Sequence, residues 1–185
     1  MSTKALIGIL IAGATGILIF LFVHLSKDNA VEIGPTHATA CTKGDVDCLP
    51  VLSYVDTQGK AYTTQSLSGK IVVVNFWATW CHPCEGEIPD LSRVYDKYKD
   101  KDVVFLGVLT NDDPSDGKLL NFASDHEMTY PIVRATSDIL NSYGYPSGLP
   151  TTFVYSKGGK RVLQRVGQVH EDEMARLLDK LVAEK

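Results

Sequence analysis

The segment from Ile71 to Trp77 constrains the fold more than any other part of this 185-residue chain. It reads Ile-Val-Val-Val-Asn-Phe-Trp, an almost unbroken apolar run. Strands that are buried on both faces have this composition, whereas a strand with one wet face alternates apolar and polar residues. We therefore expect a central strand with a layer of structure on each side, which is typical of an α/β fold.

Helix and strand patterns alternate around this segment. A helix is expected from Pro83 to about Tyr98, because apolar residues recur three and four positions apart. A second buried strand is expected at Val103–Leu109. Further elements are expected as a hairpin over 51–63, a helix to about His126 carrying Leu119, Leu120 and Phe122, a short strand at Ile132-Val133, a helix from Ser137 to about Tyr143, a hairpin of 151–155 with 161–166, and a helix over about 171–182. This order predicts a central mixed sheet flanked by helices, with the first hairpin at its N-terminal end.

The N-terminal region differs in character from the rest. The run from Ala5 to Val23 has no charged residue, and as a helix it would span roughly 29 Å, close to the ~30 Å apolar core of a bilayer. We expect three regions: a transmembrane anchor at 1–25, a linker at 26–49 and a folded domain at 50–185. A cleaved signal peptide is the alternative, but its apolar part is usually only about 7–15 residues long.

Charge and cysteine content suggest where the domain lies. Lys4 precedes the apolar run, and the positive-inside rule then places the short N-terminus in the cytoplasm and the domain outside it. Four cysteines, an even number, are typical of an oxidising compartment. The net charge of −4 and the absence of a basic patch argue against a nucleic-acid partner.

Cys81 and Cys84 flank His82 and Pro83 in the sequence C-H-P-C, directly before the expected helix. Two cysteines at this spacing can hold a metal, form an inert disulfide or exchange electrons. Unpaired N–H groups and the dipole at a helix start lower the pKa of a thiol placed there, which favours the reactive thiolate. Cys84 would lie one turn inside on the same face, where it can resolve a mixed disulfide. Pro83 suits the first turn.

The surrounding sequence resembles a known family. Val72–Leu91, which contains W-A-T-W-C-H-P-C-E-G-E-I-P, is similar to the active-site segment of thioredoxin-fold proteins, above all the membrane-anchored TlpA/ResA group and its cytochrome c maturation relatives. The stretch Gly148–Phe153, G-L-P-T-T-F, resembles the cis-proline loop of that group. An insertion at about 112–134 also matches it. The resemblance covers about residues 50–182 and implies a thioredoxin-like fold and thiol-disulfide oxidoreductase activity.

The resemblance implies roles for individual residues. Cys81 would attack disulfides and Cys84 would resolve the mixed disulfide, with no cofactor and no metal. Glu87 matches the acidic position of the group's C-x-x-C-x-x-E-x-P pattern and would tune thiol pKa and assist proton transfer. It would replace the buried aspartate of thioredoxin, whose position holds Asn75. The alternative is an ordinary solvated glutamate in the first helical turn.

Five further residues are expected to support the active site or bind substrate: Trp80, His82, Pro83, Leu149 and Pro150. Pro150, if its peptide bond is cis, would lie beside the C-x-x-C pair. A histidinium at position 82 would favour the thiolate and an oxidising potential, whereas the following proline resembles thioredoxin, a reductant. We expect a reductant, with a disulfide oxidase or isomerase as the alternative.

The expected partners are proteins that carry disulfides. The resemblance implies apocytochrome c or another envelope protein, such as a copper-site protein, as substrate, and a membrane thiol electron donor that recycles the enzyme. A copper-handling protein is an alternative of a different class, because two cysteines and a histidine are plausible ligands for a soft metal.

Cys41 and Cys48 form a second pair in C-T-K-G-D-V-D-C, just before the folded domain. A structural disulfide closing this short loop is the simplest interpretation, worth about 2.5 kcal/mol on the chain-entropy model. An auxiliary redox pair that exchanges with Cys81 and Cys84, or a metal site with His37, are the alternatives.

Overall fold

The computed structural model describes residues 47–184 of the chain. The expected anchor at 1–25, nearly all of the linker and Cys41 lie outside the described residues, so those predictions remain predictions. Within 47–184, no helix is long and apolar enough to cross a membrane.

The described part alternates strands and helices much as the sequence indicates. Its elements are β1 (Ser53–Val55), β2 (Ala61–Thr63), α2 (Thr64–Leu67), β3 (Ile71–Trp77), α3 (His82–Tyr98), β4 (Val103–Leu109), α4 (Asp116–Asp125), β5 (Ile132–Arg134), α5 (Ser137–Ser142), β6 (Thr151–Tyr155), β7 (Arg161–Val166) and α6 (Glu171–Ala183).

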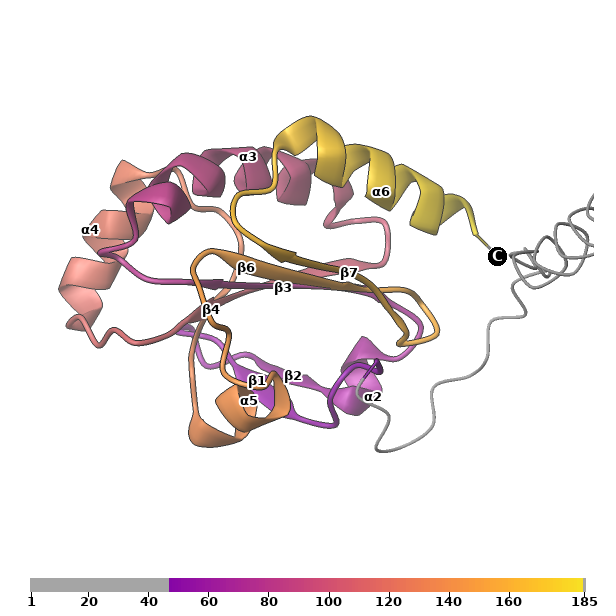
Figure 1. Ribbon diagram of the computed structural model, residues 1–185, viewed down its shortest axis with the longest axis horizontal. Helices are drawn as coiled ribbons and strands as arrows, with labels where there is room; N and C mark the ends of the chain where they lie inside the picture. The colour runs from indigo at the N-terminus through magenta and orange to yellow at the C-terminus, as the bar shows by residue number, and fades with distance from the viewer. Residues whose placement is uncertain (1–46, 185) are drawn as a thin grey trace, which may run out of the picture. The chain divides into compact units, whose positions relative to one another are not determined.

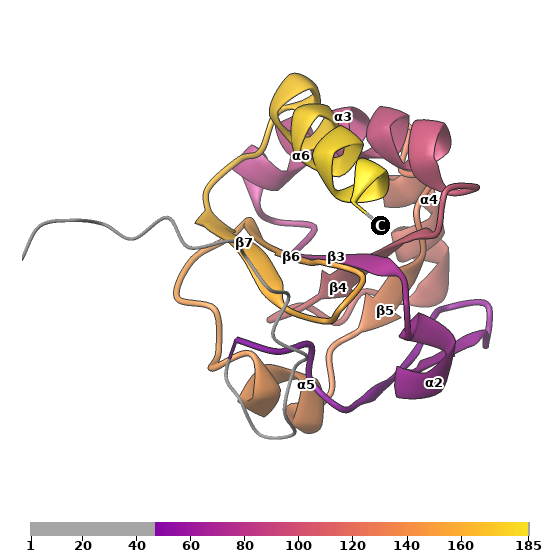
Figure 2. The same cartoon turned by 90° about the vertical axis from the view of Figure 1, so that its right-hand side faces the viewer.

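Five strands form one mixed sheet in the order β5-β4-β3-β6-β7 (Figure 2). β4 runs parallel to both β3 and β5, whereas β6 is antiparallel to β3 and β7. β3 is therefore the central strand, and all seven of its residues are buried. This confirms the expectation of a strand covered on both faces, because helices and a hairpin pack against both sides of it.

The two faces of the sheet have separate apolar cores. Figures 1 and 2 show α3 and α6 on one face, and α2, α5 and the β1-β2 hairpin on the other. Alternate residues of β3 divide between the cores: Ile71 and Val73 contact the α3/α6 side, whereas Val72 and Val74 contact the hairpin side. A third cluster lies at the carboxyl ends of β3 and β4. These layers are the mixed sheet with flanking helices and an N-terminal hairpin that the sequence predicts.

Two local features add to what the sequence indicates. Of the three apolar residues expected in the helix that ends near His126, Leu119 and Phe122 pack on the third cluster, whereas Leu120 is exposed. The four-residue helix α2 was not expected, since T-Q-S-L is too short to show a helical period. Reciprocal hydrogen bonds between Thr63 and Ser66, a capping box, stabilise its start.

Candidate functional site

Cys81 is the N-cap residue of α3, and residues 78–80 separate it from the carboxyl end of the central strand. Its backbone is extended, and its Sγ accepts a hydrogen bond from the Cys84 N–H over 3.3 Å. Cys81 and Cys84 form a disulfide with an S–S distance of 2.02 Å. The Cys84 N–H and the positive end of the helix dipole therefore lie at the Cys81 sulfur, where they favour negative charge once the disulfide is reduced.

Cys84 lies behind Cys81 in an apolar environment. The third cluster surrounds both sulfurs with the side chains of Trp77, Ala78, Ile88, Leu109, Leu119 and Ile132. Cys84 is completely buried, whereas a small part of Cys81 reaches the surface. Cys81 is therefore the more accessible cysteine of the pair, and Cys84 lies behind it.

Glu87 is buried one turn further along α3, on the same face as Cys84, and only 1% of it is exposed. Its carboxylate accepts hydrogen bonds from the Val169 N–H over 2.8 Å and from the Asn75 side-chain amide over 2.9 Å. Burial raises its pKa to about 7, while both hydrogen bonds oppose that rise. A group with this pKa can take up or release a proton at neutral pH.

Asn75 connects Glu87 to the sheet. Its amide also donates to the Thr152 hydroxyl over 3.0 Å, and its oxygen accepts from the buried Tyr130 hydroxyl over 3.4 Å. The asparagine that stands in place of thioredoxin's aspartate is thus the hydrogen-bond donor that orients Glu87.

The loop between β7 and α6 holds three parts of the site together. The Gly167 N–H donates to the Pro150 carbonyl, the Gln168 side chain donates to the Pro83 carbonyl over 2.7 Å, and the Val169 N–H donates to Glu87. Gln168 lies so close to α3 that a Cβ on Gly86 would be 2.7 Å from its amide nitrogen. Consecutive residues of one loop therefore fix the cis-proline strand, the C-H-P-C turn and the buried carboxylate.

The Leu149–Pro150 peptide bond is cis. Pro150 is buried and immediately precedes β6, whose Thr151 pairs with Phe76 near the end of β3. Leu149 is partly buried and packs against both the hairpin-side core and the cluster around the cysteines. The loop thus lies at the same end of the sheet as the disulfide.

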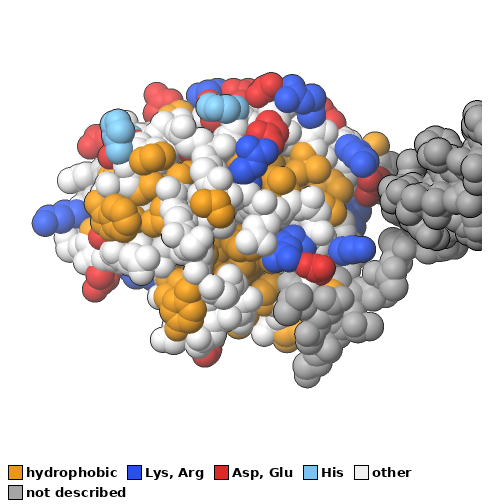
Figure 3. Space-filling model, viewed as in Figure 1, with side chains coloured by type: hydrophobic (Ala, Val, Ile, Leu, Met, Phe, Trp, Pro, Cys, Tyr) orange, Lys and Arg blue, Asp and Glu red, His pale blue; other side chains and the backbone are white. Residues whose placement is uncertain are grey.

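Trp80 is the most exposed aromatic residue beside the cysteines, with 62% of its surface accessible. Its indole N–H donates to the Asn111 carbonyl over 3.1 Å, which fixes the ring against the loop that follows β4. Tyr145 and Val166 are further exposed apolar residues, close in sequence to Pro150 and to Gly167. Figure 3 shows hydrophobic side chains exposed in several groups on one face of the molecule.

Asp112 holds the residue before Trp80. Its carboxylate accepts from both the N–H and the hydroxyl of Thr79, over 2.7 and 2.6 Å.

We predict that Asp112→Ala lowers the free energy of unfolding by about 1–3 kcal/mol, because two partly buried donors lose their acceptor. Urea denaturation of the full-length protein measures this. Asp125→Ala, at an exposed aspartate that ends α4, is the control and should change stability little; an equal loss in both variants would contradict the role of Asp112.

His82 points into solvent, with 93% of its side chain exposed. Its Nδ1 lies 3.0 Å from a carboxylate oxygen of Glu85 on the same turn. A positive charge on this ring is therefore strongly hydrated and partly balanced by Glu85, so its influence on Cys81 is weaker than that of a buried histidine would be.

Comparison with known proteins identifies the family. The model of the AhpC/TSA family matches residues 46–162, which include the cysteine pair and the cis-proline. The chain belongs to the AhpC/TSA family. Its similarity to the family extends to named enzymes: the chain is 28% identical to the thiol-disulfide oxidoreductase ResA of Bacillus cereus, covering 96% of this chain and 94% of that one. It is 32% identical to ResA of Geobacillus thermodenitrificans, covering 85% and 82%.

A solved structure agrees with this AhpC/TSA assignment. A thiol:disulfide interchange protein of the thioredoxin family from Chlorobium tepidum matches with a TM-score of 0.67 and 28% identity, covering 77% of this chain and all of that one. These findings confirm the resemblance to the TlpA/ResA group and the thioredoxin-like fold. The protein is a thiol-disulfide oxidoreductase.

The second cysteine pair lies at the border of the described residues. Cys48 forms an isolated antiparallel bridge with Lys160, beside the β6-β7 turn. Cys41 lies outside the described residues, so a Cys41–Cys48 bond stays a prediction. Among residues 47–184, no group of three or more His, Cys, Asp or Glu side chains is placed to hold a metal ion.

Several residues of the site were not found from the sequence. Gln168, Val169, Asp112 and Tyr130 come from segments far from the C-H-P-C motif, and each is of a residue type common in any protein. Thr152 lies in the G-L-P-T-T-F stretch, but the sequence indicated no role for it. The sequence gave one indication of this network: Asn75 occupies the position of thioredoxin's buried aspartate, so another group was expected to take over its role.

Proposed function

We propose that the protein is a reductant of disulfides in proteins outside the cytoplasm, held at the membrane by residues 1–25, with Cys81 as nucleophile and Cys84 as resolving cysteine. The observation that carries the proposal is the position of Cys81 at the start of α3, with Cys84 buried directly behind it. The apolar run before the domain supports the membrane location.

The first step is attack by the Cys81 thiolate on one sulfur of a substrate disulfide. The substrate S–S bond breaks, a mixed disulfide with Cys81 forms, and the leaving substrate thiolate takes up a proton. The first-turn N–H groups of α3 stabilise the Cys81 thiolate before attack.

The second step is attack by Cys84 on the Cys81 sulfur. The mixed disulfide breaks, the second substrate thiol leaves, and the enzyme retains the Cys81–Cys84 disulfide, so two electrons have passed to the substrate. Cys84 has to lose its proton in an apolar pocket, where a thiolate is disfavoured. We propose that Glu87, one turn away with a pKa near 7, accepts that proton.

The direction of electron flow depends on how strongly the site stabilises the reduced thiolate. The exposed position of His82, beside Glu85, supports a reductant, since a well-hydrated charge shifts a potential little. We predict a midpoint potential below about −220 mV, nearer to the −270 mV of thioredoxin than to the −120 mV of a strong oxidant. Equilibration of the full-length protein with glutathione buffers measures it. A potential near −120 mV would favour the oxidase alternative.

The location can be tested in intact cells. A membrane-impermeant maleimide should label the reduced Cys81 of the full-length protein without cell lysis. If labelling requires permeabilised cells, the domain faces the cytoplasm and the proposed location is wrong.

Trp80 is the residue that we expect a protein substrate to cover. Trp80→Ala should raise KM for a protein disulfide about tenfold, because an exposed aromatic at an interface centre commonly contributes more than 1 kcal/mol to binding. Its effect on a small linear disulfide such as glutathione disulfide should be slight. The matched control is Val162→Ala. Val162 is exposed near the start of β7, whereas the end of that strand leads to Gly167 beside Pro150. Equal effects on both substrates would show that Trp80 acts on the chemistry and not on docking.

Apocytochrome c, with its C-x-x-C-H cysteines, and copper-site proteins are the substrate classes that we propose, and a membrane thiol protein would return the electrons. Because only a small part of Cys81 is exposed, we expect the substrate disulfide to lie on an accessible segment.

A further inference from the structure

The first half of β4 has no neighbouring strand on one side. β5 pairs only with Gly107–Leu109. On that side the Gly107 N–H donates to the Pro131 carbonyl over 2.8 Å, and the Ala135 N–H donates to the Leu109 carbonyl over 2.9 Å. Because backbone groups alternate along a strand, those of Phe105 and Val103 point in the same direction.

Pro131 ends the ladder at this point. If β5 extended backwards along β4, the backbone nitrogen of residue 131 would face the Phe105 carbonyl and would be the next donor. Residue 131 is a proline, which has no N–H to donate. The edge of Val103–Phe105 therefore has backbone groups that the sheet itself does not pair.

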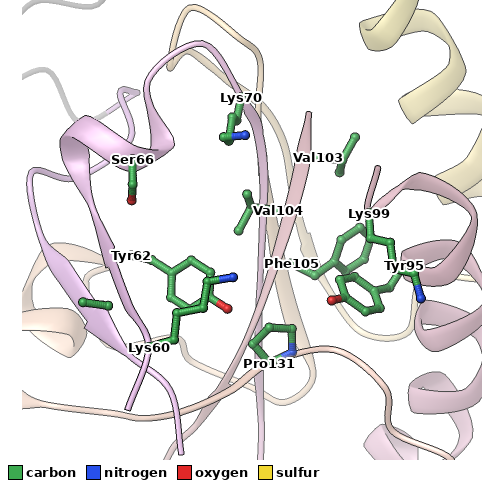
Figure 4. A pocket seen from close by; sticks show the side chains of 11 residues that line it. Lys60, Tyr62, Ser66, Lys70, Tyr95, Lys99, Val103, Val104, Phe105 and Pro131 are labelled. Atoms are coloured by element: carbon green, nitrogen blue, oxygen red, sulfur yellow. The ribbon is translucent and has the colours of Figure 1, made fainter. Parts of the chain in front are cut away.

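A cavity of about 300 Å³ lies along this edge, and Val103, Val104, Phe105 and Pro131 contribute to its lining (Figure 4). Tyr62 from β2 stands on one side of β4 and Tyr95 from α3 on the other. A volume of this size is at the lower end for ligand sites and matches a short peptide segment rather than a large molecule.

Three lysines surround the cavity, and no acidic residue is among the side chains that line it. The Lys60 ammonium lies 4.9 Å from the centre of the Tyr62 ring, and the Lys99 ammonium lies 5.7 Å from that of Tyr95. Lys70 is the third. Lys99 and Lys70 also contact the exposed side chains of two aspartates outside the lining, Asp96 and Asp102. The lining therefore carries positive charge that two nearby aspartates partly balance, in a chain whose net charge is −4.

We propose that this edge binds an extended acidic peptide segment of a partner protein as an added strand beside Val103–Phe105. Such a segment brings the N–H that the Phe105 carbonyl lacks and carboxylates that meet the lysines. Lysine and proline at a sheet edge discourage pairing with neutral strands. We therefore expect this edge to bind an acidic segment in preference to a neutral one. Val103 and Phe105 are almost fully buried, so the added strand requires the surrounding side chains, among them the exposed Lys60 and Lys99, to move outward.

The location separates this binding from the redox chemistry. The unpaired edge is at the amino end of β4, whereas Cys81 follows the carboxyl end of the parallel strand β3. A partner held here leaves the cysteines accessible, so the edge can hold a substrate or an electron donor during exchange.

The test uses the full-length protein and the peptide acetyl-Glu-Val-Glu-Val-Glu-amide. NMR should show shifts at the Val103 and Phe105 amides and slower hydrogen exchange at Phe105 when the peptide is added. The counterpart with lysine in place of glutamate should cause neither change. Lys60→Glu combined with Lys99→Glu should weaken peptide binding at least about tenfold, while Lys118→Glu, at an exposed lysine of α4, should leave it unchanged.

If the double variant does not fold, Lys60→Gln alone tests the proposal, because it removes one positive charge and adds no negative charge. It should weaken peptide binding by about threefold. The proposal is overturned if the peptide causes no shift at Val103 and Phe105, or if inorganic phosphate reproduces its effects. It is also overturned if the same amides shift with protein concentration alone, which would indicate a second copy of the chain as the occupant.

Discussion

Replacing Cys84 with alanine converts the enzyme into a trap for its substrate. Cys81 in this variant still attacks a disulfide, but no thiol remains to break the mixed disulfide. Multiple turnover should fall at least about a thousandfold, since the step that completes the reaction is lost. Non-reducing gels of cells that express full-length Cys84→Ala should show covalent adducts, and mass spectrometry of these adducts identifies the substrates and the electron donor.

The matched control is Cys81→Ala, which retains Cys84 in its buried position. It should lose both turnover and trapping, because Cys84 is not accessible to another protein. Adducts that form through Cys41, Cys48 or Cys84 would overturn the assignment of the nucleophile. An adduct with an envelope protein would support the proposed location, and one with a cytoplasmic protein would contradict it.

The substitution Glu87→Gln should change how stability depends on pH. The pKa of Glu87 is raised from 4.5 to about 7, chiefly by burial, so the folded protein holds this proton more tightly than the unfolded chain. Its contribution to stability is therefore complete below about pH 4.5 and is lost as the pH rises through about 7. The loss amounts to about 3 kcal/mol of unfolding free energy.

Glutamine resembles the protonated form, so Glu87→Gln should lack this decline. Urea denaturation between pH 4.5 and 8 gives the two profiles, and their difference isolates the residue. Glu85→Gln, at a partly exposed glutamate two residues earlier, should retain the wild-type slope. Parallel profiles for wild type and Glu87→Gln would show that the carboxyl group is not buried in solution as it is here.

The same variant tests the proton-transfer role. If Glu87 accepts the Cys84 proton, Glu87→Gln should slow release of the mixed disulfide about a hundredfold at neutral pH, while the first attack by Cys81 changes less. Stopped-flow measurements with a fluorescent mixed disulfide separate the two steps. An unchanged release rate would leave Glu87 a structural role only.

The sequence was sufficient for the parts of the fold that depend on local pattern. The apolar run of β3 indicated its central place, and a cysteine followed by proline before an amphipathic stretch indicated that Cys81 caps α3. Both follow from interactions within a few residues. The sequence did not indicate which apolar residues of α4 are buried: Leu119 and Phe122 pack on the third cluster, whereas Leu120 is exposed.

The environment of Glu87 could not be predicted in the same way. A glutamate in the first turns of a helix is usually solvated, and here the loop at Gln168 and Val169, eighty residues later in the chain, covers it. The link between Thr79 and Asp112 likewise joins segments that meet only after β3 and β4 pair. Contacts of this kind arise from the topology, so local sequence does not reveal them.

The most direct test of the account is the relative reactivity of the two cysteines in the reduced protein. Reduced full-length protein is treated briefly with a limiting amount of iodoacetamide at pH 7, and peptide mass spectrometry identifies the labelled residue. The position of Cys81 at the helix start predicts that it reacts at least about tenfold faster than the buried Cys84. Faster labelling of Cys84 would contradict the account.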